Sequence, residues 1–139
     1  MAQWYLCSMG ANLQPEQNFA KARSALQQLG EAYYSRAIYT KPVAMNSQRD
    51  FLNALFILRS EIDQYRLKRE FNAIEQHLGR DRSDPLCGIK DRPMDIDILG
   101  LLSSIDDNHN QVTWQQVPNY LQTVVPNLRH LFLQLKVKQ

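Results

Sequence analysis

Several features that would assign the protein to a class are missing from its 139 residues. No run of about 18 apolar residues occurs, so the sequence predicts no membrane-spanning helix. Residues 1–6 contain no basic stretch and no long apolar stretch, so we expect no secretory signal there. The two cysteines, Cys7 and Cys87, do not have a metal-binding or redox spacing. We therefore expect reduced thiols in a cytoplasmic protein.

An excess of charge of one sign is also missing. Sixteen Lys and Arg residues against fourteen Asp and Glu residues give a net charge of +2, too weak to predict nucleic-acid binding. The glycine-rich phosphate loop, the dinucleotide fingerprint and the H-E-x-x-H zinc motif do not occur. The three histidines are scattered, and none is a candidate catalytic base. Any nucleotide must therefore be held by other means.

The sequence does contain an ordered series of strand and helix patterns. Strands are predicted over residues 4–9, 32–39, 51–58 and 94–102, and helices over residues 15–29 and 63–78. The order β-α-β-β-α-β predicts an α+β fold, in which a split β-α-β arrangement forms an antiparallel sheet with both helices on one face. The other face is then open to a ligand or a partner. We expect a single domain over residues 1–139.

The C-terminal part of the chain gives weaker signals. Residues 108–113 are typical of a turn, and residues 121–135 have a helical pattern that is broken at Pro126. Two long loops, 40–50 and 80–93, separate the main elements. Loops of this length often bind ligands.

Asp95 and Asp97 form the strongest chemical pattern. Alternation along a strand places both carboxylates on one face, about 7 Å apart, while Ile96 and Ile98 point into the core. The two charges repel each other unless a cation lies between them, and Mg²⁺ prefers carboxylate and phosphate oxygens. The alternative is that both side chains face water, since D-x-D is a common string.

Four basic residues, Arg80, Arg82, Lys90 and Arg92, lie in the loop ahead of this strand. Guanidinium groups bind phosphate oxygens in bidentate pairs, so a basic loop beside a metal site suits a polyphosphate substrate. The alternative is a solvated loop whose own acidic residues partly neutralise its charge.

Asn53 is a lone amide in the apolar strand 51–58. A buried amide needs hydrogen-bond partners, and it can bind the donor and acceptor groups of a heterocycle. A structural hydrogen bond to a neighbouring loop explains it equally well, so both interpretations stay open.

Five short segments occur in an order and at spacings that resemble one enzyme family. They are residues 10–13, 39–44, 50–54, 74–82 and 92–99. Together they resemble the 6-hydroxymethyl-7,8-dihydropterin pyrophosphokinases of folate biosynthesis. Members of that family have a ferredoxin-like fold, in agreement with the predicted order of elements. They transfer diphosphate from ATP to the hydroxymethyl group of the dihydropterin.

The resemblance implies roles for individual residues. Asp95 and Asp97 would hold two Mg²⁺ ions that bridge the ATP phosphates. The catalytic loop arginines, which close over the polyphosphate, would be Arg82 and Arg92. The dihydropterin pocket would be formed by Thr40, Val43, Phe51 and Asn53. Further nucleotide contacts would come from Asn72, Pro118 and Tyr120.

Some positions depart from the family pattern. Asn119 stands where the family has a histidine, and the family's downstream Arg-x-Phe has no clear match. The chain thus resembles a divergent member that is shorter at its C-terminal end. An active pyrophosphokinase that binds ATP and a dihydropterin, but no nucleic acid or membrane, is the first hypothesis. The alternatives are a weakened paralogue that binds a pterin or nucleotide or acts as a partner protein, and an unrelated ferredoxin-like interaction module.

Overall fold

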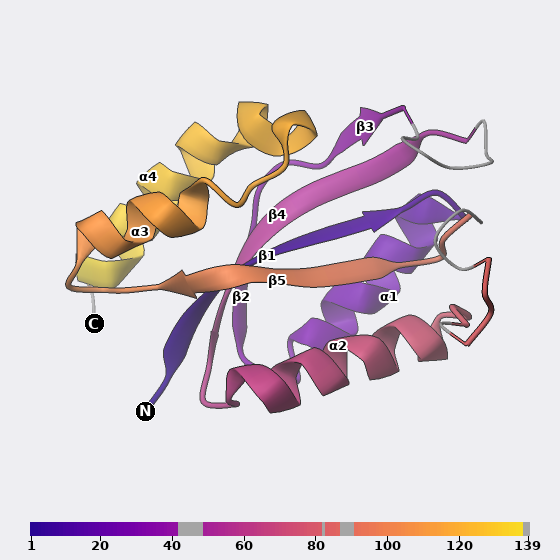
Figure 1. Ribbon diagram of the computed structural model, residues 1–139, viewed down its shortest axis with the longest axis horizontal. Helices are drawn as coiled ribbons and strands as arrows, with labels where there is room; N and C mark the ends of the chain where they lie inside the picture. The colour runs from indigo at the N-terminus through magenta and orange to yellow at the C-terminus, as the bar shows by residue number, and fades with distance from the viewer. Residues whose placement is uncertain (42–48, 82, 87–90, 138–139) are drawn as a thin grey trace.

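The computed structural model describes residues 1–41, 49–81, 83–86 and 91–137 (Figure 1). The elements in chain order are β1 (Gln3–Ala11), α1 (Pro15–Leu26), β2 (Glu31–Tyr34), β3 (Ile38–Thr40), β4 (Phe51–Ser60), α2 (Gln64–His77), β5 (Asp95–Leu102), α3 (Asp107–Trp114), the 3-10 helix η1 (Asn119–Val124) and α4 (Val125–Val137). Within this part of the chain, no helix is both long and apolar enough to cross a membrane.

The described strands form one antiparallel sheet in the order β2-β4-β1-β5, and β3 also pairs with β4. The central strand β1 therefore lies between β4 and β5, which are far from it in sequence. Helices α1 and α2 pack together on one face of the sheet (Figure 1). The predicted α+β, ferredoxin-like fold with a split β-α-β arrangement is confirmed.

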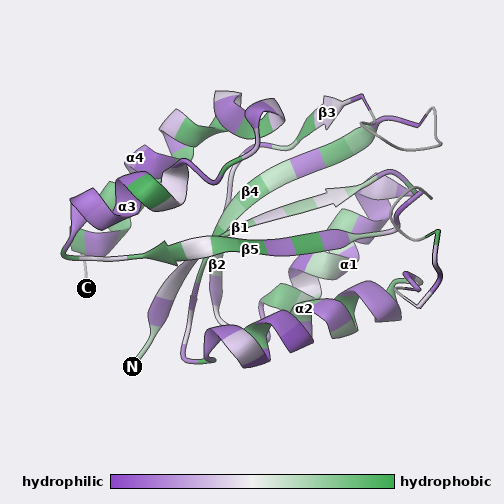
Figure 2. Cartoon of the chain, in the orientation of Figure 1, coloured by the Kyte–Doolittle hydropathy of each residue, from purple (hydrophilic) through white to green (hydrophobic). Residues whose placement is uncertain are grey.

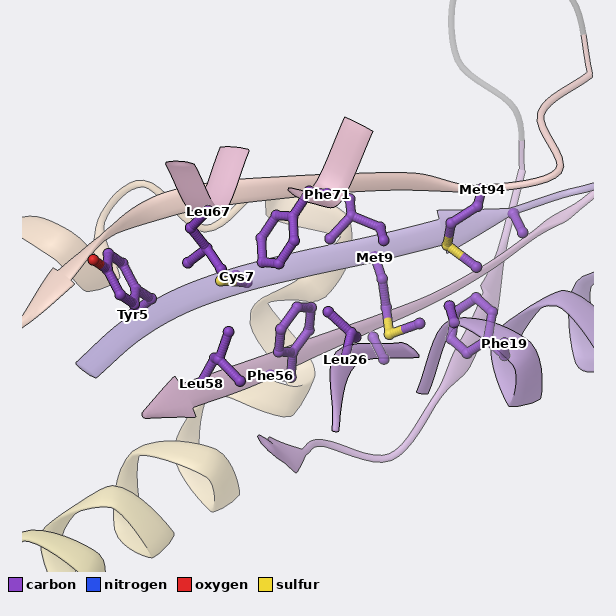
Figure 3. Packing of buried hydrophobic residues seen from close by; sticks show 14 of the residues in the cluster. Tyr5, Cys7, Met9, Phe19, Leu26, Phe56, Leu58, Leu67, Phe71 and Met94 are labelled. Carbon is purple, nitrogen blue, oxygen red and sulfur yellow. The ribbon is translucent and has the colours of Figure 1, made fainter. Parts of the chain in front are cut away.

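The core between the sheet and these two helices follows from strand alternation. From Tyr5 to Ala11, every second residue of β1 points to this side and is buried, including Cys7 and Met9 (Figure 3). Helix α2 contributes Leu67 and Phe71, at the spacing of one helical face. Burying a large apolar side chain contributes about 1.5–3 kcal/mol, so this cluster supplies much of the driving force for folding. The thiol of Cys7 is free, and burial raises its pKa well above the usual value.

The sequence predicted that the second face of the sheet is open to a ligand or a partner. In the structure, part of this face is covered by the chain itself. Trp4 and Leu6 of β1 and Leu55 of β4 point to this side, where α3, η1 and α4 cover them. Phe132 of α4 lies edge-on to Trp4, with ring centroids 5.4 Å apart. The C-terminal segment thus builds a second core over one half of this face.

The predicted turn at residues 108–113 is wrong, because α3 spans that segment. The carboxylate of Asp106 accepts hydrogen bonds from the backbone N–H groups of Asn108 and His109 and so caps the helix. The break expected at Pro126 is confirmed to within one residue, because η1 ends at Val124 and α4 begins at Val125. Pro126 lies in the first turn of α4, where the N–H that it lacks would have no partner within the helix.

Two irregularities modify the predicted strands. The strand expected at 32–39 is divided into β2 and β3 around Ser35, whose backbone N–H donates to Leu55 O and whose Oγ accepts from Leu55 N, both at 2.9 Å. In β5, Gly100 pairs with Leu6 and Ile98 pairs with Cys7. Leu99 is therefore an extra residue, a β-bulge, in that strand.

Candidate active site

The second face of the sheet changes from apolar to polar beyond the C-terminal helices. Alternation brings Ser8 and Gly10 of β1, Asn53 of β4 and Asp97 of β5 to this face. Figure 2 shows hydrophilic bands that interrupt the hydrophobic course of β4 and β5. A pocket lies here, lined by Ser8, Met9, Gly10, Thr40, Lys41, Phe51, Asn53, Arg92, Asp95, Asp97, Tyr120 and Leu121.

Most of the residues that the sequence singled out meet in this pocket. They are Thr40, Phe51, Asn53, Arg92, Asp95, Asp97 and Tyr120. Two predicted residues are not among the described residues that line the pocket. Asn72 is half-buried on α2, which packs on the opposite face of the sheet. Pro118 directly precedes η1. Val43 and Arg82 lie outside the described residues.

Asn53, Gly10 and Asp95 form a row across three neighbouring strands. Gly10 pairs with Asn53 on one side and with Asp95 on the other. Neighbouring strands lie about 4.8 Å apart, so the backbones of Asn53 and Asp95 are about 10 Å apart, with Gly10 between them. A Cβ at Gly10 would lie 2.7 Å from Asn53 Oδ1, so a larger residue here would displace the amide from its present position.

The amide of Asn53 is 5% exposed and has a defined orientation. Its Nδ2 donates to Thr40 Oγ1 at 2.6 Å and more weakly to Phe51 O at 3.4 Å. Both sequence interpretations are compatible with this arrangement. The amide makes a structural hydrogen bond to β3, and it also lines the pocket.

Asp95 is held by two arginines. Arg80 Nη1 donates to its Oδ1 at 2.7 Å, and Arg92 Nη1 donates to its Oδ2 at 3.3 Å. Arg80 is buried, so it is neither in a solvated loop nor exposed to bind phosphate in this conformation. The sequence signal for this burial is Glu75, a charged residue within the apolar stripe of α2, which required a buried partner.

Arg92 is fixed by Asn12, a buried residue that sequence reasoning left without a role. Asn12 Oδ1 accepts a hydrogen bond from Arg92 N at 2.5 Å, and Asn12 N donates to Arg92 O at 2.9 Å. The Nδ2 of Asn12 donates to Asp91 Oδ1 at 3.0 Å. The backbone of Arg92 is therefore anchored to the end of β1, and its side chain extends into the pocket.

Tyr120, on η1, forms part of the pocket wall. Burial of the phenol, and then the negative charges of Asp95 and Asp97, raise its pKa, while Arg92 opposes this effect. The hydroxyl therefore stays protonated at neutral pH and remains a hydrogen-bond donor.

The chemistry of this pocket fits a hard divalent cation that arrives with a ligand. Asp95 and Asp97 both line it, yet the described residues contain no group of three or more His, Cys, Asp or Glu side chains that could hold a metal ion. Mg²⁺ commonly binds through one or two carboxylates and completes its shell with water and substrate phosphates. The acidic pair matches that donor set.

Comparison with known proteins identifies the family. The profile of 7,8-dihydro-6-hydroxymethylpterin-pyrophosphokinase matches residues 6–130. The 2-amino-4-hydroxy-6-hydroxymethyldihydropteridine pyrophosphokinase of two Porphyromonas gingivalis strains is 37% identical over 102 aligned positions, and the match covers 71% of this chain and 69% of that protein. The chain belongs to the 7,8-dihydro-6-hydroxymethylpterin-pyrophosphokinase family, and the resemblance inferred from the five segments is confirmed. Enzymes of this family are transferases that use ATP and metal ions.

Proposed function

We propose that the chain transfers diphosphate from ATP to the hydroxymethyl group of 6-hydroxymethyl-7,8-dihydropterin, a step of folate biosynthesis. Membership of the family and the name of the Porphyromonas gingivalis relative support this activity. The observation that carries it is a single pocket that contains Asn53, the acidic pair and Arg92.

In this proposal the acidic side of the pocket binds the polyphosphate. Asp95 and Asp97 would hold two Mg²⁺ ions, which neutralise phosphate charge and keep the β-phosphorus open to attack. Arg92 lies beside Asp95, where its guanidinium group would bind phosphate oxygens and stabilise negative charge as it moves to the leaving group. The contribution of the protein is positioning and charge compensation, with little acid–base chemistry.

The other side of the pocket binds the dihydropterin. Asn53 would make paired hydrogen bonds to the heterocycle, with Thr40 holding its amide and Phe51 contributing an apolar wall. Val43 belongs to the same predicted pocket. The row from Asn53 across Gly10 to Asp95 supports a geometry in which the two substrates lie side by side on the sheet.

Some of the proposed nucleotide-binding residues line the pocket, and others do not. Tyr120 and Arg92 line the pocket, and Pro118 adjoins η1, so these residues suit a nucleotide bound along that wall. Arg82 stays a predicted catalytic arginine. Asn72 could contact the nucleotide only if the nucleotide extended around the edge of the sheet to α2. Its role as a nucleotide contact stays a prediction.

The proposed reaction yields two products, the diphosphorylated dihydropterin and AMP. The hydroxymethyl oxygen bonds to the β-phosphorus, and the bond between the β-phosphorus and the oxygen that bridges it to the α-phosphorus breaks. That oxygen leaves as part of AMP, and the hydroxyl proton goes to solvent. We expect AMP to form from ATP only when Mg²⁺ and the dihydropterin are both present, as measured by chromatography. Binding of the dihydropterin or an ATP analogue in calorimetry without AMP formation would favour the weakened paralogue. Absence of both would contradict the proposal.

We also propose that residues 1–139 form one pterin pyrophosphokinase-like domain that acts in the cytoplasm. The family match spans both halves of the sheet and reaches into α4. The buried, free thiol of Cys7 is compatible with a reducing compartment.

A further inference from the structure

A buried acidic residue lies behind the acidic pair. Glu75, on α2, is 0% exposed, and it is not among the residues that line the pocket. Fully buried glutamates are rare unless their charge and their lone pairs are satisfied. We propose that Glu75 is a positioning residue that sets the metal affinity of Asp95 and Asp97, an inference that rests on the proposed function.

The first contact is with the backbone between the two aspartates. Glu75 Oε2 accepts a hydrogen bond from Ile96 N at 2.7 Å. Among the described strands, β5 ends the row β2-β4-β1-β5, so none of them pairs with its outward N–H groups. Helix α2 lies along that edge (Figure 1). Glu75 satisfies one of these groups. Because Asp95 and Asp97 flank Ile96, the contact fixes the backbone from which both carboxylates project.

The second contact is with Arg80, which Glu75 shares with the acidic pair. Arg80 Nη1 lies 3.8 Å from Glu75 Oε2 and 2.7 Å from Asp95 Oδ1. A cation bound to Asp95 neutralises the charge of this carboxylate, so the ion pair between Asp95 and Arg80 becomes weaker. The cation also repels the guanidinium group of Arg80. Glu75 keeps a counter-charge beside Arg80, so Asp95 can bind a cation without leaving a buried positive charge uncompensated.

The end of α2 holds both partners rigidly. Glu75 follows Leu67 and Phe71 at helical spacing on the face packed against the sheet. Beyond it, Arg80 N donates to Glu75 O at 3.0 Å around Gly79, whose φ of 106° is the left-handed conformation that glycine adopts at helix ends. The carbonyl and the carboxylate of one residue thus place both the backbone and the charge of Arg80.

The Glu75→Gln variant separates the charge of this residue from its hydrogen bond. A glutamine oxygen still accepts from Ile96 N, but it no longer compensates Arg80. Loss of a residue that supports metal ligands commonly lowers metal affinity by about 10–100-fold, so we expect the Mg²⁺ concentration for half-maximal activity to rise by about that factor. We expect saturating Mg²⁺ to restore most of kcat, and KM for the dihydropterin to change less than about twofold.

The test measures Mg²⁺ dependence with and without turnover. The Mg²⁺ titration of diphosphate transfer is compared with the Mg²⁺ titration of ATP-analogue binding in calorimetry. Glu70→Gln, on the exposed surface of α2, is the matched control. Thermal unfolding and hydrogen exchange at Ile96 N show whether the fold and the contact survive.

A rise in the Mg²⁺ midpoint in both titrations, with Ile96 still protected, supports the proposal. An unchanged midpoint, or an equal loss of dihydropterin and ATP-analogue binding together with stability, overturns it in favour of a structural carboxylate. Failure of the proposed function gives a different result, because the unsubstituted chain itself would then show no Mg²⁺-dependent binding. That result overturns the metal site and the role of Glu75 together.

Discussion

Arg80 and Asp95 form an ion pair of 2.7 Å in which the arginine side chain is 7% exposed and the aspartate 23% exposed. Asp97, two residues further along β5, is exposed on the pocket side. The two members of the D-x-D pair therefore have different surroundings. Asp95 belongs both to the buried charge network and to the pocket, whereas Asp97 faces the pocket from an exposed position.

This difference predicts different costs for the two alanine substitutions. We expect Asp97→Ala to abolish Mg²⁺-dependent binding of an ATP analogue while the free energy of unfolding changes by less than about 0.5 kcal/mol. Asp95→Ala removes the same ligand and also leaves Arg80 with one carboxylate fewer, which we expect to cost about 3 kcal/mol. Calorimetry and urea unfolding measure the two effects. If Asp97→Ala binds the MgATP analogue as the parent does, the metal assignment is wrong.

Asn53→Ala tests the dihydropterin side of the pocket. Loss of paired hydrogen bonds in a buried slot costs about 2–3 kcal/mol, so we expect dihydropterin affinity to fall about a hundredfold and ATP-analogue affinity to stay nearly constant. Both affinities are measured by calorimetry. Thr40→Ser, which keeps the hydroxyl that holds the amide, serves as the matched control. An equal fall in both affinities, or a gross loss of stability, would identify Asn53 as a structural amide.

Arg92→Ala tests charge stabilisation during transfer. The guanidinium group is expected to act on charge that develops in the transition state, so kcat should fall by about 10²–10³-fold while dihydropterin affinity changes little. Asn12 holds Arg92 through its backbone, so the loop should stay anchored in the variant. Arg69→Ala, on the exposed surface of α2, is the control. A similar loss in kcat and in dihydropterin affinity would point to a disordered pocket instead.

Tyr34 predicts a change in stability at alkaline pH. Its hydroxyl is buried and has no hydrogen-bond partner among the described residues. Burial raises its pKa from 10.0 to about 12, while the nearby Arg23 opposes this shift. The unfolded phenol ionises first, so the unfolded state binds fewer protons over this interval and the free energy of unfolding falls as pH rises from about 10 to about 12. Tyr34→Phe should reduce that fall.

Urea unfolding at about pH 9 and about pH 11.5 measures the effect of Tyr34. The matched control is Tyr65→Phe, on the exposed surface of α2. An equal loss of stability between the two pH values in the parent and in Tyr34→Phe would exclude this phenol as the source.

Most of the predicted site residues that line the pocket lie on regular strands, the exceptions being Arg92 and Tyr120. A strand has a side-chain period of two, so the strings around Asn53 and around Asp95 and Asp97 specify which side chains share a face before any tertiary contact is known. Asn12 is different. Its role depends on Arg92, 80 residues away in sequence, and no local pattern encodes such a contact.

The segment after β5 is harder to predict because its local signals are ambiguous. Aspartate and asparagine favour turns and also cap helices, so the segment around Asp106 fits either structure. Only packing against Leu101 and its neighbours decides, since Thr113 Oγ1 donates to Leu101 O at 2.7 Å and ties α3 to the sheet. The second core over the far half of the sheet follows from this docking.

The bulge at Leu99 divides β5 into two stretches whose side-chain alternation is out of phase. Before it, Asp95 and Asp97 keep the odd-numbered positions on the pocket face. After it, Leu102 reaches that same face from an even-numbered position and packs beneath the C-terminal helices. The inserted residue therefore separates the stretch of β5 that carries the pocket carboxylates from the stretch that packs beneath the C-terminal helices. Repacking of the distal stretch therefore does not change the face on which the two aspartates lie, and the C-terminal helices affect the pocket through Tyr120 and Leu121 instead.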